Sequence, residues 1–373
     1  MITQLHIDSI APVSNDATRN PPLPMFNTLR SSSLRYSRFS FQLRRSLATG
    51  VGAVPQTISQ TRTPAPQFSS ATPVDVPGPP PATRKDVYQL PVNNEELARL
   101  NNQHVLLKML IGGNYTDRIK EHLADQPGQK KVILDLGCGT GAWAMDMATD
   151  FPHCSVVGAD VAPMDLGLAP KNLRIDVCDA NKGLTMYQNG SFNLVNGRLI
   201  AMGKSAWIKN YPALIGEVAR ILRPGGFLQL QEWDFFVVDA EKNMIGTDSW
   251  FARWCASLRH GLAVRSASVN AAESLDATIR GQGTLESVQQ QNVWMPIGPC
   301  FPKDTVDGLR LNLVGEFMRE NVKAFIKGGR TLIVGSGMSV EDYDNLALQA
   351  TKEVQDVSLP MYLRLNCVTA RKQ

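Results

Sequence analysis

The chain has 373 residues, of which 43% are hydrophobic, and this is enough for one large domain or two ordinary ones. The formal net charge is +4, but residues 1–74 carry seven Arg, no Lys and two Asp, a net of +5, so the remainder sums to −1. A near-neutral body argues against a nucleic-acid-binding groove. No apolar run approaches the roughly 20 residues of a membrane helix, so we expect no membrane span.

The six cysteines are scattered without a C-x-x-C pair, and the five histidines do not cluster. Disulfide frameworks and zinc sites need closer, patterned spacing. We therefore expect free thiols in an intracellular, reducing compartment, and no metal site.

The N-terminal segment differs in composition from the rest. Residues 17–74 contain no acid, and residues 25–50 are Arg- and Ser-rich with interspersed Phe and Leu, which is typical of a mitochondrial transit peptide. Asp8 and Asp16 upstream argue against a transit peptide, and a basic tail with no targeting function fits the composition equally well. Residues 51–85 are rich in Pro, Ser and Thr and indicate an extended linker. We predict a disordered tail over 1–85 and a folded domain over 86–373. The protein is expected in mitochondria if residues 25–50 are a targeting sequence, and otherwise in the cytoplasm.

The folded part begins with an amphipathic helix over 93–111, in which His104 occupies one step of the apolar rhythm. We expect this helix to cover the functional site and His104 to be half-buried on it. Strands and helices then alternate, which predicts a mostly parallel sheet with crossover helices. The predicted strands are 132–134, 155–160, 173–177, 192–196, 227–232, 288–297 and 359–370.

The predicted helices are 142–148, 211–222, 243–280, 304–325 and 339–357, with a turn at 223–226. The fold prediction is thus α/β, with a Rossmann-like, doubly wound, seven-stranded and mostly parallel sheet. Residues 130–235 form its cofactor-binding core, and residues 243–373 supply a helical cap and the C-terminal part.

The most informative motif follows the first strand, where Asp135 precedes glycines at three alternate positions, Gly137, Gly139 and Gly141. Glycine supplies positive φ and lets the backbone approach a ligand closely. In a doubly wound sheet, ligands bind beyond the carboxyl ends of the strands. The dinucleotide fingerprint is G-x-G-x-x-G, and here the third glycine comes one residue early, which argues against a nicotinamide oxidoreductase.

Further polar residues end the later strands. Asp160, 19 residues after Gly141, is placed to accept hydrogen bonds from a ribose diol, although Asp is also an ordinary turn residue. Arg198 is a cofactor or substrate contact or a surface cation. Glu232 is a general base or anchors a loop. Glu232 and His104 are the only catalytic candidates, and we assign a catalytic role to neither.

Cys138, within the glycine motif, has no evident activating neighbour, so we expect a packed small residue rather than a nucleophile.

The strand, the acid and the alternate glycines resemble motif I of the class I S-adenosylmethionine-dependent methyltransferases. In that family the acid and the loop backbone hold the methionine end of the cofactor, and an acid after the third strand meets the adenine. The resemblance implies S-adenosylmethionine as cofactor, bound by Asp135, Gly137, Cys138, Gly139, Thr140, Gly141, Asp160, Val161, Asp179, Ala180 and Arg198.

From residue 86 to the end, the chain is similar to one fungal group, the secondary-metabolite methyltransferases related to the regulator of secondary metabolism. The similarity is carried by residues 90–113, 141–148, 223–226, 230–232 and 302–304. It implies methyl transfer to a small molecule, without nucleic acid, in fungal secondary-metabolite biosynthesis. The alternative is a regulator that keeps the methyltransferase fold and acts through protein partners.

Overall fold

The computed structural model describes residues 94–164, 166–201 and 208–373. The predicted tail over 1–85 and the transit peptide over 25–50 lie outside these residues and stay predictions.

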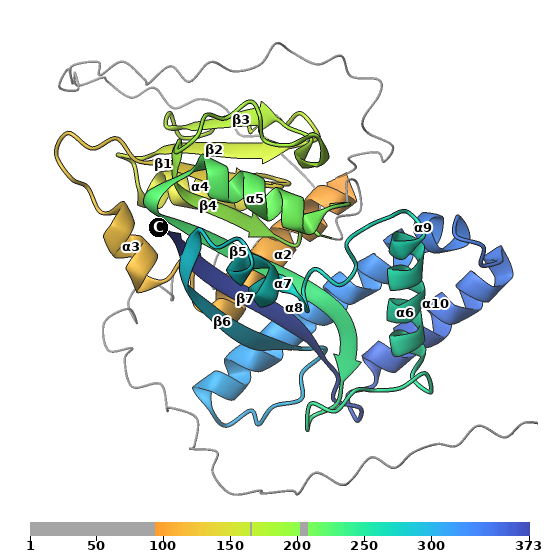
Figure 1. The fold of residues 1–373 in the computed structure, drawn as a ribbon. Coiled ribbons are helices and arrows are strands. Elements are labelled where there is room, and N and C mark those ends of the chain that lie inside the picture. Colours follow the sequence, from red (N-terminus) through yellow and green to blue (C-terminus); the bar gives the residue numbers. More distant parts are fainter. Residues whose placement is uncertain (1–93, 165, 202–207) are drawn as a thin grey trace, which may run out of the picture. The chain divides into compact units, whose positions relative to one another are not determined.

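The centre of the fold is one seven-stranded sheet (Figure 1). Its strands are β1 Val132–Leu136, β2 Ser155–Asp160, β3 Leu173–Val177, β4 Phe192–Arg198, β5 Leu222–Val238, β6 Leu285–Pro296 and β7 Tyr362–Lys372. The order is β3-β2-β1-β4-β5-β7-β6, in which β1 to β5 are parallel and β7 runs antiparallel to both of its neighbours. The predicted fold class is confirmed, and the carboxyl ends of β1 to β5 meet at one edge.

Helices cover the sheet and extend beyond it (Figure 1). They are α2 Asn94–Ile111, α3 Asp117–Leu123, α4 Ala142–Asp150, the 3-10 helix Ala180–Lys182, α5 Tyr211–Ile221, α6 Trp250–Ala263, α7 Leu275–Arg280, α8 Val306–Gly328, α9 Arg330–Val334 and α10 Val340–Gln355. The predicted helix over 93–111 corresponds to α2, which packs on α8. The helical cap consists of two insertions, α6–α7 before β6 and α8–α10 before β7.

The two faces of the sheet have separate apolar cores. On β1, Ile133 belongs to a cluster with α3 and α4, whereas its neighbour Leu134 belongs to the larger cluster with α5 and the cap. Because successive strand residues point to opposite faces, a strand that is apolar on both faces must be covered on both. This is why the predicted strands are nearly continuous apolar runs.

Three predicted elements differ from the structure. β5 runs from Leu222 to Val238, through the predicted turn at 223–226 and past the predicted end at 232, because β7 pairs with it along most of its length. Within 243–280, only α6 and α7 are helical, and the chain between them forms turns that include Ser266 with φ +62°. The short helix α3 was not predicted. In each case tertiary pairing and packing outweigh local propensity.

The far end of β5 contains a bulge, where its register against β7 shifts between Trp233 and Val237. Phe235 within it has φ +57°, which is uncommon for a residue other than glycine. Asp234 is fully buried and holds the bulge, because its Oδ2 accepts from Arg364 Nε at 2.5 Å and its Oδ1 accepts from the Phe236 amide at 3.0 Å. β4 ends opposite residue 231, so the bulge projects beyond the neighbouring strand.

None of the helices in the described ranges is long and apolar enough to cross a membrane.

The ion pair between Asp234 and Arg364 yields a stability prediction. Arg364→Ala leaves a fully buried carboxylate without its cation, which costs about 3 kcal/mol in the free energy of unfolding. Urea unfolding measures the loss. Arg330→Ala, which removes an arginine from a solvent-exposed pair with Asp344, is the control and should leave the midpoint unchanged. Equal midpoints for the two variants would contradict a structural role for the buried pair.

Candidate active site

A cleft lies at the carboxyl ends of β1 to β5. Its floor is formed by the glycine loop after β1 and by the segments that follow β2, β3 and β4. Helix α2 closes it with Glu96, Arg99, Leu100 and Gln103, and α8 contributes Phe325. A smaller pocket continues from it between α2, the glycine loop and the start of α4.

The structure brings the predicted site residues together with one exception. The cleft is lined by Gly137, Gly139, Asp160, Val161, Asp179, Ala180, Arg198 and Glu232. The smaller pocket is lined by His104, Asp135, Cys138 and Thr140, and shares Gly137, Gly139 and Arg198 with the cleft. Gly141 lines neither, but it precedes α4 with φ +72°, and a Cβ there would lie 2.8 Å from the Leu166 side chain. The left-handed backbone therefore favours glycine at this position.

The glycine loop is fastened to the end of β2. Gly137 and Cys138 both donate from their amides to the Ala159 carbonyl, at 2.8 and 3.0 Å, and Gly139 donates to Asp160 Oδ2 at 2.9 Å. Gly137 and Gly139 have φ of +68° and +55°, so the expectation that these glycines supply left-handed backbone is confirmed.

Asp160 therefore has a structural role that sequence reasoning missed. Its Oδ1 accepts from the Ala162 amide at 3.2 Å, so both carboxylate oxygens hold backbone amides. Burial raises the pKa of this carboxyl, and the hydrogen bonds from Gly139 and Ala162 oppose the rise. A carboxylate offers about four acceptor positions, so this one retains capacity for further donors.

Asp135 lies under the loop and is 3% exposed. Its Oδ1 accepts from Asn196 Nδ2 at 2.7 Å, and Asn196 Oδ1 accepts from Gln229 Nε2 at 3.0 Å. Burial raises the pKa of Asp135 to about 6, although nearby Arg198 and the Asn196 hydrogen bond lower it. Asn196 was not singled out as a partner of Asp135, yet aligning β1 with β4 would have placed the two residues opposite each other.

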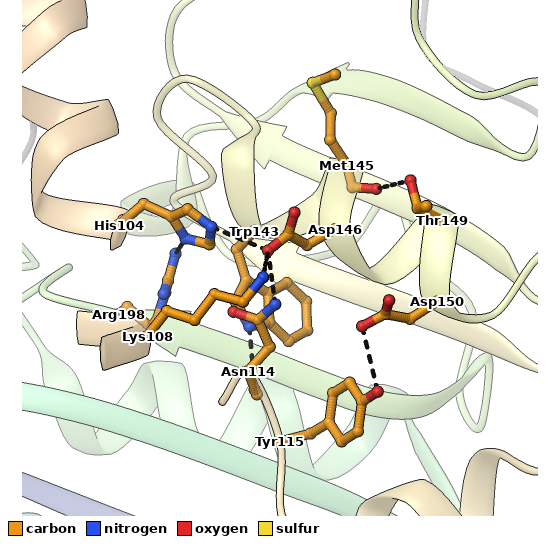
Figure 2. A network of polar contacts seen from close by, with 10 residues as sticks. All are labelled: His104, Lys108, Asn114, Tyr115, Trp143, Met145, Asp146, Thr149, Asp150 and Arg198. Atoms are coloured by element: carbon orange, nitrogen blue, oxygen red, sulfur yellow. Dashed lines mark hydrogen bonds and ion pairs between the residues drawn. The ribbon is translucent and has the colours of Figure 1, made fainter. Parts of the chain in front are cut away.

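A second network joins the cover helix to the rim of the sheet (Figure 2). Arg198 Nη2 lies 3.0 Å from His104 Nδ1, and because guanidinium can only donate, Nδ1 must accept. The ring proton of neutral His104 is then on Nε2, which donates to Asp146 Oδ2 at 3.1 Å. The same oxygen accepts from Lys108 at 2.5 Å and Asn114 at 2.8 Å.

His104 is buried, at 8% exposure, rather than half-buried as expected. Burial lowers its pKa, outweighing the hydrogen bond to Asp146. Burial alone would raise the pKa of Asp146, but the hydrogen bonds from His104, Lys108 and Asn114 hold it well below its usual range. Both ring nitrogens of His104 are thus engaged in positioning contacts.

Arg198 is not a freely exposed surface cation, because it lines both parts of the cleft. Burial lowers its pKa, while the charges of Asp135 and Asp146 raise it. Among the residues that the structure describes, its hydrogen-bond partner is the uncharged ring of His104. This guanidinium therefore lacks a directly bonded anion within the described chain.

Glu232 makes the contacts of a loop anchor. Its Oε1 accepts from the amides of Ile200 and Ala201, at 3.0 and 3.1 Å, and from the Tyr211 hydroxyl at 3.0 Å. Burial raises the pKa of this carboxyl to about 7, although these hydrogen bonds lower it. The sequence left two alternatives for Glu232, a general base or a loop anchor. These hydrogen bonds are those of a loop anchor.

Asp179 and Cys138 have clear local roles. Asp179 caps the 3-10 helix by accepting from the Asn181 amide at 3.1 Å, so it is a turn residue that also lines the cleft. Burial, with the nearby charges of Asp135 and Asp160, raises the pKa of the buried Cys138 thiol, which is the behaviour of a packed residue. All six cysteines are free thiols, and no group of three or more metal-ligating side chains occurs in the described ranges.

Comparison with known proteins identifies the class. Residues 133–226 match the sequence profile of a family described as a methyltransferase domain. The chain is 33% identical over 296 residues to the secondary metabolism regulator laeA of Coprinopsis cinerea, spanning 78% of this chain and 71% of that protein. It is 31% identical over 257 residues to methyltransferase pytC of Aspergillus terreus, spanning 66% of this chain and 72% of that protein.

Among solved structures, phosphoethanolamine N-methyltransferase 2 of Haemonchus contortus aligns with 73% of this chain and 57% of its own, at 17% identity and a TM-score of 0.38. The sequence relationships and the sheet order carry the assignment. The chain belongs to the class I S-adenosylmethionine-dependent methyltransferases, in the group related to the fungal laeA and pytC proteins.

The geometry around His104 predicts its protonation state. Burial lowers the pKa of His104, so the ring should titrate below the ordinary histidine pKa of 6.5. Above this midpoint the ring should be the neutral tautomer with its proton on Nε2. In the pH range between the folded and unfolded pKa values, the unfolded chain binds more protons. The contribution of His104 to stability is therefore complete above pH 6.5 and is lost as the pH falls.

Long-range ¹H–¹⁵N NMR measures both the tautomer and the titration midpoint, with His104→Gln assigning the signals. A midpoint at or above 6.5, or a proton on Nδ1 in the neutral ring, would contradict the described network.

Proposed function

We propose that this methyltransferase transfers the methyl group of S-adenosylmethionine to a small molecule in the biosynthesis of a secondary metabolite. The observation that carries the proposal is the convergence, in one cleft, of the glycine loop, the strand-end acids and Arg198 with a second half walled by apolar side chains. Small-molecule sites are concave and mostly apolar, with few polar groups that fix orientation.

In this proposal, the methionine end of the cofactor lies in the smaller pocket with Asp135, Cys138, Thr140 and Arg198. A largely buried cation needs an anionic partner, and the cofactor carboxylate provides one for Arg198. Asn196 occupies one oxygen of Asp135, which leaves the other to accept from the cofactor ammonium. The loop backbone at Gly137 and Gly139 approaches the cofactor, since neither residue has a side chain in the way.

The adenosyl end lies along β2 and β3. Asp160 and Val161 hold the ribose, through the acceptor capacity of Asp160 that its backbone amides leave available. Asp179 and Ala180 hold the adenine. Because Asp160 also fastens Gly139, ribose binding and the shape of the glycine loop depend on the same carboxylate.

When bound, the cofactor supplies a methyl group already activated on a sulfonium. The chain therefore has to align the acceptor and exclude water, and alignment alone lowers a barrier by roughly 7–11 kcal/mol. Helices α2 and α8 close the cleft for this purpose, and Glu232 positions the segment after β4 that lines it. The proposal assigns no general base.

The names of three relatives support two different cellular roles. Methyltransferase pytC and the N-methyltransferase verN of Clonostachys rogersoniana, 30% identical over 152 residues, are named for methyl transfer. The relative with 33% identity over 296 residues is named a regulator of secondary metabolism. Regulation through protein partners is therefore the second candidate function.

Two variants separate the ends of the cofactor site. S-adenosylhomocysteine carries the amino-acid end, whereas 5′-methylthioadenosine lacks it. Arg198→Met should weaken S-adenosylhomocysteine by roughly 5- to 150-fold, the loss of one partner in a buried polar contact, and leave 5′-methylthioadenosine unchanged. Asp160→Ala should weaken both ligands. Calorimetric titration measures the affinities, with Arg330→Met as the surface control. Equal losses for the two ligands in Arg198→Met would contradict the carboxylate assignment.

Metabolite profiling of a strain lacking the protein separates the two functions. A biosynthetic enzyme should leave one precursor, lighter by a methyl group, that the purified protein converts with S-adenosylmethionine. The loss of many unrelated metabolites, with no precursor that accepts a methyl group, would support the regulator instead.

A further inference from the structure

Three aromatic rings that line the cleft contact one another and form one aromatic wall. Trp233 and Phe235 come from the bulge of β5, and Phe325 comes from α8. The ring centroids lie 5.5 Å apart for Trp233 and Phe235, 5.7 Å for Trp233 and Phe325, and 5.9 Å for Phe235 and Phe325. Each ring thus touches the other two, and together they form a continuous aromatic surface.

The backbone that presents this wall is held in an uncommon conformation. Phe235 has φ +57°, and Leu199, which lines the cleft from the segment after β4, has φ +58°. Backbone strain of this kind concentrates at ligand sites. Bulges next to such sites redirect side chains, and the buried Asp234–Arg364 pair fixes this one.

The wall carries a polar group without a partner. Trp233 is 2% exposed, and its indole Nε1 has no hydrogen-bond acceptor among the residues that the structure describes. A buried donor left unpaired is unfavourable, and buried Trp N–H groups usually find a partner. An acceptor atom on a molecule bound against the wall would satisfy it.

The cation nearest to the wall is already neutralised. Arg99 donates from Nε and Nη2 to the Glu96 carboxylate, at 2.9 and 2.7 Å, and from Nη1 to Gln103 and Asn321, at 2.6 and 3.1 Å. Its guanidinium lies over the Phe325 ring, 4.7 Å from the centroid. Arg99 therefore packs on the Phe325 ring and offers no unmatched positive charge to an anionic substrate.

We propose that the methyl acceptor is an uncharged, planar aromatic molecule that lies against the Trp233–Phe235–Phe325 wall and accepts a hydrogen bond from Trp233 Nε1. This inference rests on the proposed function, because it places the acceptor in the same cleft as the cofactor. The rings supply apolar, π-stacking surface, and the indole N–H fixes the orientation of the polar atom. An anionic acceptor would find no cation left to pair with, because Arg99 is paired with Glu96 and the proposed function assigns Arg198 to the cofactor carboxylate.

The test uses the full-length protein saturated with S-adenosylhomocysteine and three probes. 2-Naphthol is planar, uncharged and has an acceptor oxygen, 2-naphthalenesulfonate adds a charge, and cyclohexanol lacks the aromatic ring. Calorimetric titration compares the wild type with Trp233→Phe, which keeps a ring but removes the N–H. Trp250→Phe is the matched control, since Trp250 lies on α6 against Arg253 and does not line the cleft.

We expect 2-naphthol to bind at least tenfold tighter than either other probe. Its affinity should fall roughly 2- to 12-fold in Trp233→Phe, the size of one net hydrogen bond, and stay unchanged in Trp250→Phe. Selectivity in the wild type supports the proposal independently of how the variants fold.

Equal or tighter binding of the sulfonate, or equal affinity of 2-naphthol for Trp233→Phe and the wild type, would overturn the acceptor proposal alone if S-adenosylhomocysteine still binds. Failure of the wild type to bind S-adenosylhomocysteine would instead overturn the proposed function, and the acceptor proposal with it.

Discussion

The contact on which the site depends is the hydrogen bond from Arg198 to the uncharged ring of His104. It joins the end of β4 to the cover helix, and through His104 Nε2 it reaches Asp146 on α4. A protonated ring could not accept from a guanidinium, so burial of His104 and its lowered pKa are conditions for this arrangement. Among the described residues, no anion is bonded to Arg198, and this is the strongest physical reason to expect a ligand carboxylate in the smaller pocket.

The other polar contacts of the site also position the chain, because their side chains hold backbone segments in place. Asp160 holds the amide of Gly139, Glu232 holds the segment after β4, and Asp234 holds the bulge of β5. Each is a buried or partly buried carboxylate, Asp160 at the end of β2 and the other two within β5. This is consistent with a reaction whose methyl donor is already activated, because accurate placement is then the main demand on the protein.

The strands and the glycine loop could be predicted because they depend on residues that are close together in the sequence. The apolar runs specify buried parallel strands, and the alternate glycines after Asp135 specify a left-handed loop, which the φ angles of Gly137 and Gly139 confirm. The contacts that complete the site are not local. Asn196 meets Asp135 only when β1 and β4 pair, and Phe325 meets Trp233 only when α8 folds back over the cleft. The length of β5 and its bulge likewise follow from pairing with β7, and the sequence of residues 222–238 alone does not predict them.

The most direct test of the account is a crystal structure of the full-length protein with S-adenosylhomocysteine. We expect the ligand carboxylate within hydrogen-bonding distance of the Arg198 guanidinium, with His104 still accepting from Arg198. The ribose hydroxyls should lie on Asp160 and the adenine beside Asp179. A ligand bound in the cleft with its carboxylate away from Arg198, or an Arg198 side chain that leaves His104 to pair elsewhere, would contradict it.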